Sequence, residues 1–515
     1  MPGRLKNMYI LGMNSSSKSE KFWGLLGPLI LFALIVCNKF IPIINGNQEQ
    51  YLGLPKQFIN TNWIVNGFSL SEFPGTRIVY DYLIGNLLSF YDFKLVADAT
   101  SIINMFFLAF PLYRLVKHFG MKGPSGFMWW QLVLLSTIGF GAFFGGEWFL
   151  GEAEAKTFAY IGILWGLCFY FEGHLLKSSV AFALGAIFHP LAAGWPFAVV
   201  VLHELIRTKK IVPVIKMSLI FLVINAPLLV YYAPRMLIHA PSEFAGVSSS
   251  WIYTFYRVPH HTAPFKSWDF FMAKFLPGAL KLIAFFIFFS LIKKRIKTPT
   301  TQQLISFIQT GCVFILTMLL FSYFKISANF LKFFLFRFNV ILQLLCFVGV
   351  YCVVKEFFGE KLYQFKKYLL PLLLTLSSYS LGRAIYKNQV LLPAKFAAQQ
   401  AKLDDLFGFA KSTPQGAVFM NYDIKDDSPD GVYDSFIRNT ERDLFVNFKF
   451  LPADGIKLVE WYRRIQMSKK LQRREQSWKE FLDKEKVDYV LSAQEIPELK
   501  KVFTSKNKIN VYQTR

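Results

Sequence analysis

Long apolar runs dominate the first three quarters of the chain. Runs of roughly 20 residues, the length that crosses the hydrocarbon core of a bilayer, recur until about Leu392, after which charged and apolar positions mix as in a water-soluble domain. The pattern predicts about 11 crossings, near 23–44, 96–114, 127–145, 157–175, 178–189, 191–206, 211–233, 272–293, 302–324, 333–354 and 367–386. We therefore expect a mainly α, polytopic transmembrane helical bundle over 1–389.

Beyond that point, residues 390–515 are predicted to form a small soluble α/β domain. Short stretches rich in β-branched and aromatic residues predict strands over 416–422, 444–450, 487–493 and 509–513. Helical periodicity lies between them, around 457–474 and 478–486.

Composition agrees with the membrane interpretation. Of 515 residues, 54% are apolar and only 17% are charged, which is too apolar for an ordinary soluble enzyme. The net charge of +24 does not indicate nucleic acid, because residues 1–389 hold 35 basic and 15 acidic side chains. That excess is typical of short cytoplasmic loops.

The same charges predict an orientation. If 77–91 lies along the membrane surface and His189-Pro190 is a tight outer turn, basic clusters near 114–122, 207–210, 293–297 and 361–367 share one side. That side would be the cytoplasm, giving an N-in/C-out chain with an exported C-terminal domain. The two long outer loops, about 45–95 and 234–271, are then where function is expected.

The first outer loop carries an isolated acid, Glu49, in the string NGNQEQY. Transfer of a sugar to a hydroxyl needs a carboxylate to accept the proton, and a donor dissolved in the bilayer would place that carboxylate at the membrane boundary. Glu49 is therefore a candidate catalytic base, with a solvated loop acid as the alternative.

A second cluster, GGEWFLGEAEAKTFAY, brings Glu147, Glu152, Glu154 and Lys156 to the outer mouth of two predicted helices. Such charges near hydrocarbon are usually paired or functional. They could coordinate a divalent cation or position a sugar, with Lys156 facing a phosphate. An ion-pair cap between the helices is an equal alternative. The five cysteines show no zinc or disulfide spacing.

A phosphate leaving group also requires cations at headgroup depth. The candidates on the predicted outer side are Arg77, Arg235, Arg257, Lys325, Lys332 and Arg337. Arg337 is favoured because it lies in the aromatic run KFFLFRF. An unpaired guanidinium is energetically costly there, and a phosphate bound through two oxygens would satisfy it. Snorkelling to ordinary lipid headgroups is the alternative. His189 and the pair His260-His261 are weaker candidates for hydrogen-bonding groups.

With these features the chain resembles the GT-C superfamily of polytopic glycosyltransferases, especially its bacterial branches, over nearly its whole length. QEQY at Glu49 is similar to the acidic motif where that superfamily places its catalytic carboxylate. EAEAKTFAY resembles the acidic stretch before a crossing in these relatives, which implies substrate-binding or structural roles for Glu154 and Lys156. The C-terminal segment resembles the exported domain of such proteins, and this resemblance rests on Arg438, Arg442, Lys449 and Trp461.

Two departures favour a metal-independent mechanism or lost activity. Glu49 stands between glutamines, and Asn62-Trp63 lies where an Asp-Trp is expected. The resemblance implies transfer of a sugar from a polyprenyl-phosphate donor to a glycan, lipid or protein acceptor at the outer face of a bacterial inner membrane. The alternatives are a flippase for lipid-linked glycans and a non-catalytic assembly protein that binds a partner through its C-terminal domain.

Overall fold

The computed structural model describes residues 18–514 except 66, 71–74, 122–141, 151, 238–243, 245, 325–326, 365, 424–432 and 453. The predicted crossing 127–145 therefore falls mostly outside the described residues. Its last residues, 142–145, are not helical.

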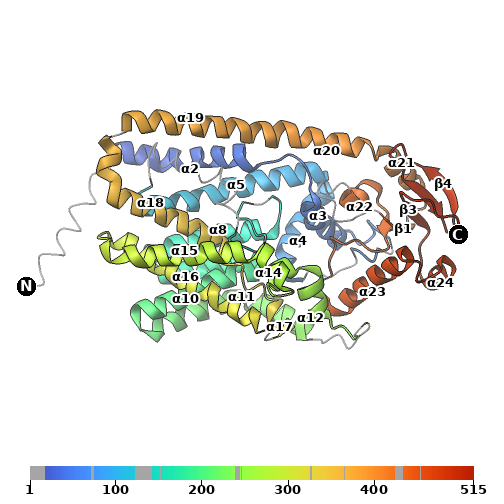
Figure 1. Ribbon diagram of the computed structural model, residues 1–515, viewed down its shortest axis with the longest axis horizontal. Helices are drawn as coiled ribbons and strands as arrows, with labels where there is room; N and C mark the ends of the chain where they lie inside the picture. Colours follow the sequence, from blue (N-terminus) through green and yellow to red (C-terminus); the bar gives the residue numbers. More distant parts are fainter. Residues whose placement is uncertain are drawn as a thin grey trace, which may run out of the picture.

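A bundle of long helices forms the body of the protein (Figure 1). Its helices are α2 (Lys18–Lys39), α5 (Phe93–His118), α8 (Ala155–Phe171), α9 (Leu175–Phe188), α10 (Pro190–Thr208), α11 (Ile211–Leu237), α15 (Leu276–Ile292), α16 (Pro299–Tyr323), α18 (Asn339–Gln364) and α19 (Lys366–Ile385). Within the described part of the chain, six are long and apolar enough to cross a membrane: α5, α10, α11, α15, α16 and α18. They indicate an integral membrane protein, while the predicted number of crossings stays a prediction.

The helices begin and end where the sequence contains breaking residues. Pro190 starts α10 directly after His189, as expected for proline in a first helical turn, so α9 and α10 meet in a tight reversal. At the close contact of α8 with α9, a Cβ on Gly162 would lie 2.6 Å from the Ala181 carbonyl oxygen. Only glycine permits this approach.

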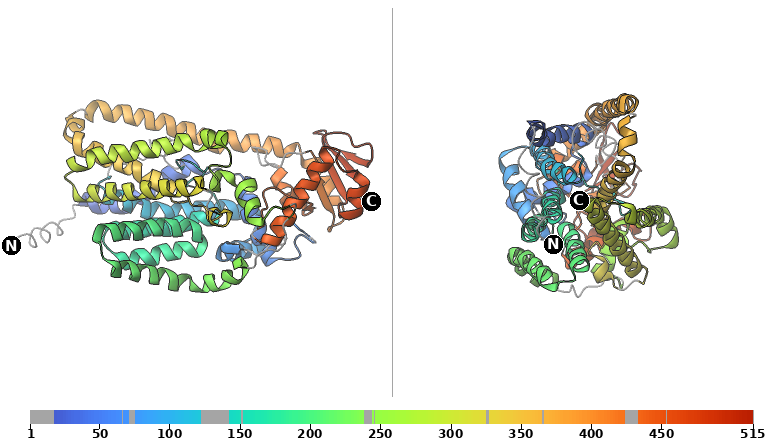
Figure 2. Two further views of the ribbon diagram at one scale, coloured as in Figure 1. Left: turned by 60° about the horizontal axis from the view of Figure 1, so that its bottom comes forward. Right: turned by 90° about the vertical axis from the view of Figure 1, so that its left-hand side faces the viewer.

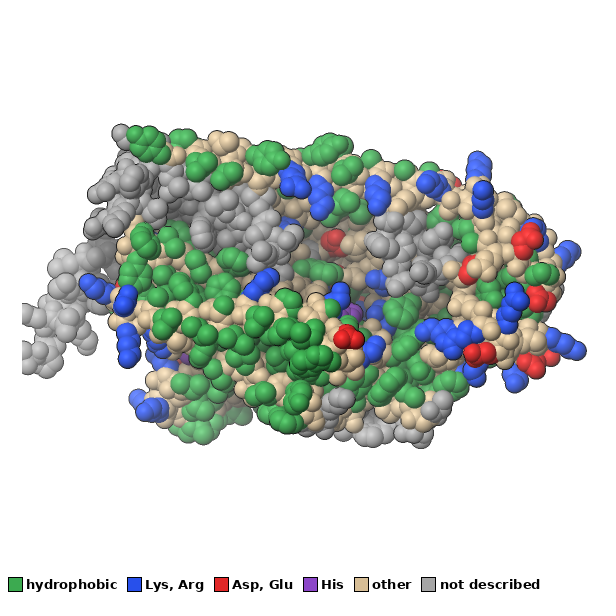
Figure 3. Space-filling view, in the orientation of Figure 1, with side chains coloured by type: hydrophobic (Ala, Val, Ile, Leu, Met, Phe, Trp, Pro, Cys, Tyr) green, Lys and Arg blue, Asp and Glu red, His purple; other side chains and the backbone are tan. Residues whose placement is uncertain are grey.

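The two ends of the bundle differ. The turns at 118–121, 208–211 and 293–298, the last residue of α18 at 364 and the first of α19 at 366 lie at the end away from the C-terminal region (Figure 1). In the sequence, these positions adjoin the predicted cytoplasmic clusters. The opposite end carries short helices: α3 (Gly46–Ile59), η1 (Gly75–Arg77), α4 (Ile78–Phe90), α12 (Ser249–Trp251), η2 (Ile252–Arg257), α13 (Pro259–Thr262), α14 (Trp268–Lys274) and α17 (Ala328–Leu331). Figure 3 shows Lys and Arg side chains gathered at the left end and over the C-terminal region, with hydrophobic side chains between.

One helical rod joins the bundle to the C-terminal region. α19 continues through the π-helical segment η4 (Tyr386–Leu391) into α20 (Leu392–Ala401), along one edge of the molecule (Figures 1 and 2). Asn388 and Gln389 donate to the carbonyl oxygens of Asn38 and Phe40, both at 2.6 Å. The predicted boundary at 389/390 falls inside this rod, and the division into two domains stays a prediction.

The C-terminal region contains a small mixed sheet in the order β2-β1-β3-β5-β4. β1 (Val418–Asn421) pairs in parallel with β2 (Asp443–Leu444) and β3 (Tyr489–Ser492), and β5 (Asn510–Gln513) runs antiparallel to β3 and β4 (Lys500–Thr504). The helices α21 (Asp404–Ser412), η5 (Tyr433–Ser435), α22 (Phe436–Thr440), α23 (Gly455–Gln472) and α24 (Trp478–Lys484) complete it.

This sheet confirms the prediction of a small α/β unit, with two differences of detail. The segment 444–450 contributes only the end of β2, because Phe445 and Phe450 leave the strand and pack into separate cores. β4 was missed because its burial pattern is mostly exposed, as is typical of an edge strand.

Candidate functional site

Glu49 lies on a helix rather than in a loop. Asn45 forms a capping box with Gln48, which starts α3, so the string NGNQEQY encodes a helix start. Residues two apart on a helix point about 200° apart. Glu49 and Tyr51 therefore face opposite sides of α3, whereas Asn47 and Tyr51 share one side.

The side of α3 that bears Glu49 faces the C-terminal region. Arg438 of α22 donates from Nε and Nη2 to the Glu49 carboxylate at 2.8–3.0 Å, and Glu49 is 3% exposed. Burial raises the pKa of Glu49, and Arg438 opposes that effect. Both oxygens are thus held by a bidentate ion pair that joins α3 to α22. Its role as a base stays a prediction.

A different acid, Glu147, lies at the centre of a charged cluster. A turn at Gly145 and Gly146, with φ of +86° and +65°, leads into it. Asn339 fixes this turn to the start of α18, accepting from the Phe143 N–H at 2.8 Å and donating to the Phe144 carbonyl oxygen at 2.6 Å. The Glu147 side chain is thereby placed beside Arg337, two residues before Asn339.

Three nitrogens surround the Glu147 carboxylate. Arg337 Nη1 lies 2.6 Å from Oε2, Lys156 Nζ lies 3.6 Å from Oε2, and His261 Nδ1 lies 3.1 Å from Oε1. Lys156 also pairs with Glu154 at 3.0 Å. These side chains come from four separate segments, and we call Glu147, Glu154, Lys156, His261 and Arg337 the charged cluster.

The charged cluster is closed in by aromatic rings and by α3. Lys156 Nζ lies 4.4 Å from the Trp148 ring centre, and the Arg337 guanidinium lies 4.5 Å from that of Phe334. Asn47 of α3 donates to Glu154 at 3.4 Å, and Asn45 donates to Glu152. The first predicted outer loop and the acidic segment therefore form one assembly.

Tyr51 connects this assembly to Arg77. The Arg77 guanidinium lies 4.9 Å from the Tyr51 ring centre, and Tyr51 is near enough to interact electrostatically with both Lys156 and Arg337. Of the predicted phosphate-binding cations, Arg77 is therefore the one that stacks on Tyr51.

The carboxylates of this region differ in protonation. Burial would raise the pKa of Glu147, but Arg337, Lys156 and His261 outweigh it and hold the pKa at about 2. For Glu152, burial and the neighbouring Glu154 raise the pKa to about 8. Glu147 is therefore ionised at neutral pH, whereas Glu152 is mostly protonated.

The histidines have separate positions. His189 accepts from the Ala192 N–H at 3.2 Å and caps α10, so this contact is structural. The charges of Arg337 and Glu147 also act on its imidazole. His261 belongs to the charged cluster, and burial lowers its pKa to about 3. It is therefore neutral beside Glu147.

Several buried polar atoms of this region have incomplete hydrogen bonding. Among the described residues, Arg337 Nε and the Tyr160 hydroxyl have no hydrogen-bond partner. An unsatisfied buried polar group costs about 1–3 kcal/mol, so such atoms mark places suited to a polar ligand. The described part of the chain contains no group of three or more His, Cys, Asp or Glu side chains arranged to hold a metal ion.

The other predicted cations lie apart from the charged cluster or outside the description. Arg257 donates to the Phe448 carbonyl oxygen at 3.0 Å, and Lys332 is partly buried. The side chain of Arg235 and residue Lys325 are not among the described parts. In the C-terminal region, Arg442 donates to backbone carbonyls including Thr413, and Trp461 donates to Asn447, both structural contacts.

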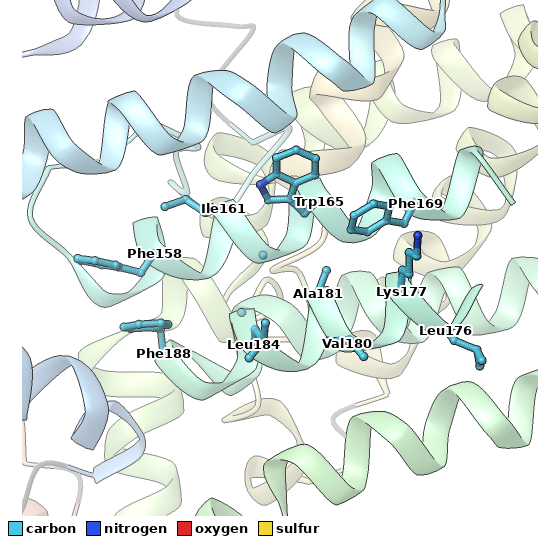
Figure 4. A pocket seen from close by; sticks show the side chains of 12 residues that line it. Phe158, Ile161, Trp165, Phe169, Leu176, Lys177, Val180, Ala181, Leu184 and Phe188 are labelled. Atoms are coloured by element: carbon cyan, nitrogen blue, oxygen red, sulfur yellow. The ribbon is translucent and has the colours of Figure 1, made fainter. Parts of the chain in front are cut away.

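A groove of about 570 Å³ runs between α8 and α9 (Figure 4). Its lining is almost wholly apolar, and the stacked rings of Phe158 and Phe188 lie at one end of it. Lys156 lies on a different face of α8 from Phe158 and Trp165, because it points about 200° away from Phe158.

Sequence reasoning missed Asn47, Tyr51 and Tyr160, and it treated His261 as a weak candidate. The capping box at Asn45 could have revealed α3, and with it the shared face of Asn47 and Tyr51. The contact of Arg337 with Glu147 joins positions 190 apart in the chain and has no local signal.

No protein-family model matches the chain, and no curated protein matches it. Among solved structures, the chain is similar to the crystal structure of ArnT from Cupriavidus metallidurans in the apo state, at 11% identity and a TM-score of 0.35, over 97% of this chain and 99% of that one. Because that likeness is low, the function proposed below rests on the side chains of the site.

Proposed function

We propose that this protein is a membrane glycosyltransferase that moves a sugar from a polyprenyl-phosphate donor to a glycan, lipid or protein acceptor. The observation that carries the proposal is the charged cluster, in which Lys156 and Arg337 lie buried together beside the end of the bundle. Buried cations are costly unless they are paired, and phosphate oxygens bind an arginine fork well.

The position of the cluster supports a donor that is dissolved in the membrane. It lies where apolar helices end and the C-terminal region begins, so a donor whose lipid chain lies among those helices would present its phosphate there. The basic connections lie at the other end of the bundle, and under the positive-inside rule they would be cytoplasmic. Transfer would then take place at the outer face of a bacterial inner membrane.

Each predicted site residue receives a role in this proposal. Arg337 and Lys156 stabilise the departing phosphate, and Arg77 adds positive potential through its place beside Tyr51. Glu154 holds Lys156 in position. His189 orients the start of α10 near the phosphate, and Glu49 attaches the C-terminal region to α3.

A turnover measurement tests the proposal. The full chain, reconstituted in liposomes, would be given decaprenyl phosphates that carry radiolabelled mannose, glucose or arabinose, with cell-envelope extract as the acceptor source. Arg337→Ala should reduce sugar transfer by at least about 100-fold, the loss typical when a group that stabilises transition-state charge is removed.

Arg114→Ala is the control, because Arg114 also pairs with a glutamate, donating from Nε and Nη2 to Glu172 at 2.6–2.7 Å, but does so at the end of the bundle where the basic connections lie. It should keep transfer within a few-fold of wild type. Equal losses in the two variants would contradict a specific role for Arg337, and movement of the lipid without loss of its sugar would favour a flippase.

A further inference from the structure

We propose that Glu147 occupies the phosphate position of the site until the donor displaces it, and that the displaced carboxylate then accepts the proton of the acceptor hydroxyl. This inference rests on the proposed function and deepens it, because it names the base of the same reaction. It assigns the proton to a residue other than Glu49.

The first argument is geometric. Glu147 lies 2.6 Å from Arg337, 3.6 Å from Lys156 and 3.1 Å from His261, so its carboxylate occupies the place where phosphate oxygens would pair with the two cations. Two anions cannot share these donors in a buried site, since like charges at close range repel strongly. A phosphate that takes over the contacts with Arg337 Nη1 and Lys156 Nζ must therefore move Glu147 aside.

The second argument concerns the chain around Glu147. The turn at Gly145 and Gly146 directly precedes it, and a Cβ added at Gly146 would meet only the His260 ring, at 3.8 Å. On its other side, Trp148 is 40% exposed while it covers Lys156. Glu147 is thus preceded in the chain by a glycine and followed by a partly exposed tryptophan, so its chain neighbours leave room for its side chain to move.

The third argument is that displacement makes Glu147 a better base. Its pKa is about 2 because cations outweigh burial, and a base of such low pKa accepts protons poorly. Once phosphate neutralises those cations, burial acts almost alone and the pKa of Glu147 rises. The groups that face it and set this balance are Arg337, Lys156, His261, His189, Tyr160 and Glu154.

The chemical step balances as follows. The acceptor oxygen forms a bond to the anomeric carbon while the bond from that carbon to the phosphate oxygen breaks. Its electron pair leaves with polyprenyl phosphate, which Arg337 and Lys156 stabilise. The hydroxyl proton passes to Glu147, and the anomeric centre is inverted.

Glu147→Gln separates binding from chemistry, because it keeps the shape and removes the competing charge. Binding of decaprenyl phosphate to the full chain in nanodiscs should strengthen by at least about 10-fold, while sugar transfer falls at least about 100-fold. Weaker binding, or transfer that is retained, would overturn the proposal. A merely structural Glu147 would lose binding and transfer together.

Glu147→Asp serves if the first variant does not fold, because it keeps the charge and shortens the side chain. Transfer should fall about 10-fold or more while decaprenyl phosphate binds at least as tightly as to wild type, and unchanged transfer would overturn the proposal. If the wild type transfers sugar but the variants contradict these expectations, only the inference fails. If the wild type transfers no sugar from any donor tested, the proposed function fails.

Discussion

Two buried glutamates near the same end of the bundle are held in contrasting ways. Among the described residues Glu49 is bound by Arg438, which satisfies both of its oxygens through a bidentate pair. Glu147 is shared among three nitrogens at unequal distances, and Arg337 Nε beside it has no hydrogen-bond partner among the described residues. A completed pair is suited to holding two segments together, whereas an incomplete cluster is suited to exchanging one partner for a ligand.

The largest effect on stability is expected from breaking the completed pair. Arg438→Met should lower the free energy of unfolding by about 3–5 kcal/mol, because Glu49 is left buried without its counter-charge. Limited proteolysis should then release the C-terminal region faster. Glu49→Gln should lose less stability, since the amide still accepts from Arg438.

The same two variants separate structure from catalysis at Glu49. If Glu49 only joins segments, sugar transfer should follow stability in both variants. If it is the base, as the sequence predicts, Glu49→Gln should lose transfer while Arg438→Met keeps it at a temperature where both are folded.

The next effect concerns ligand affinity. Lys156→Met should weaken binding of decaprenyl phosphate by about 10- to 100-fold, which corresponds to the 1.5–3 kcal/mol of a charge-assisted hydrogen bond. Decaprenol, which has the same chain and no phosphate, should bind wild type and variant alike. An equal loss of affinity for both lipids would show that Lys156 acts through packing rather than through phosphate recognition.

A third test uses pH and lies within the C-terminal region. Burial raises the pKa of Asp443 to about 7, against hydrogen bonds such as that from the Phe68 N–H at 2.9 Å. The folded state therefore binds more protons than the unfolded state between about pH 4 and pH 7, so stability falls as pH rises through that window. Asp443→Asn should flatten this decline in apparent Tm. Parallel slopes for the two proteins would contradict the assignment.

The smallest effect is expected at an exposed ion pair. Lys94 and Asp98 lie 2.6 Å apart on α5, with side chains 59% and 26% exposed. Solvent screening limits such a helical pair to about 0.3–0.5 kcal/mol, so Asp98→Asn should hardly change thermal unfolding and should leave decaprenyl phosphate binding unaltered. A large change would show that distance alone, rather than burial, decides these energies.

The sequence predicted what depends on local pattern. Apolar runs indicated the helical bundle, and alternating stretches indicated the small sheet, because burial along an element repeats with its period. The sequence could not show that α3 turns Glu49 toward Arg438 and Tyr51 toward Arg77, since that depends on how the helix packs. Nor could it pair Glu147 with Arg337, because only the fixing of the Gly145-Gly146 turn by Asn339 brings them together.

The most direct test of the central claim is a structure of the full chain in a nanodisc with decaprenyl phosphate bound. The account predicts a phosphate between Lys156 and Arg337, with the Glu147 carboxylate moved out of contact with Arg337. A phosphate bound elsewhere, or a Glu147–Arg337 pair that stays intact at saturating lipid, would contradict it.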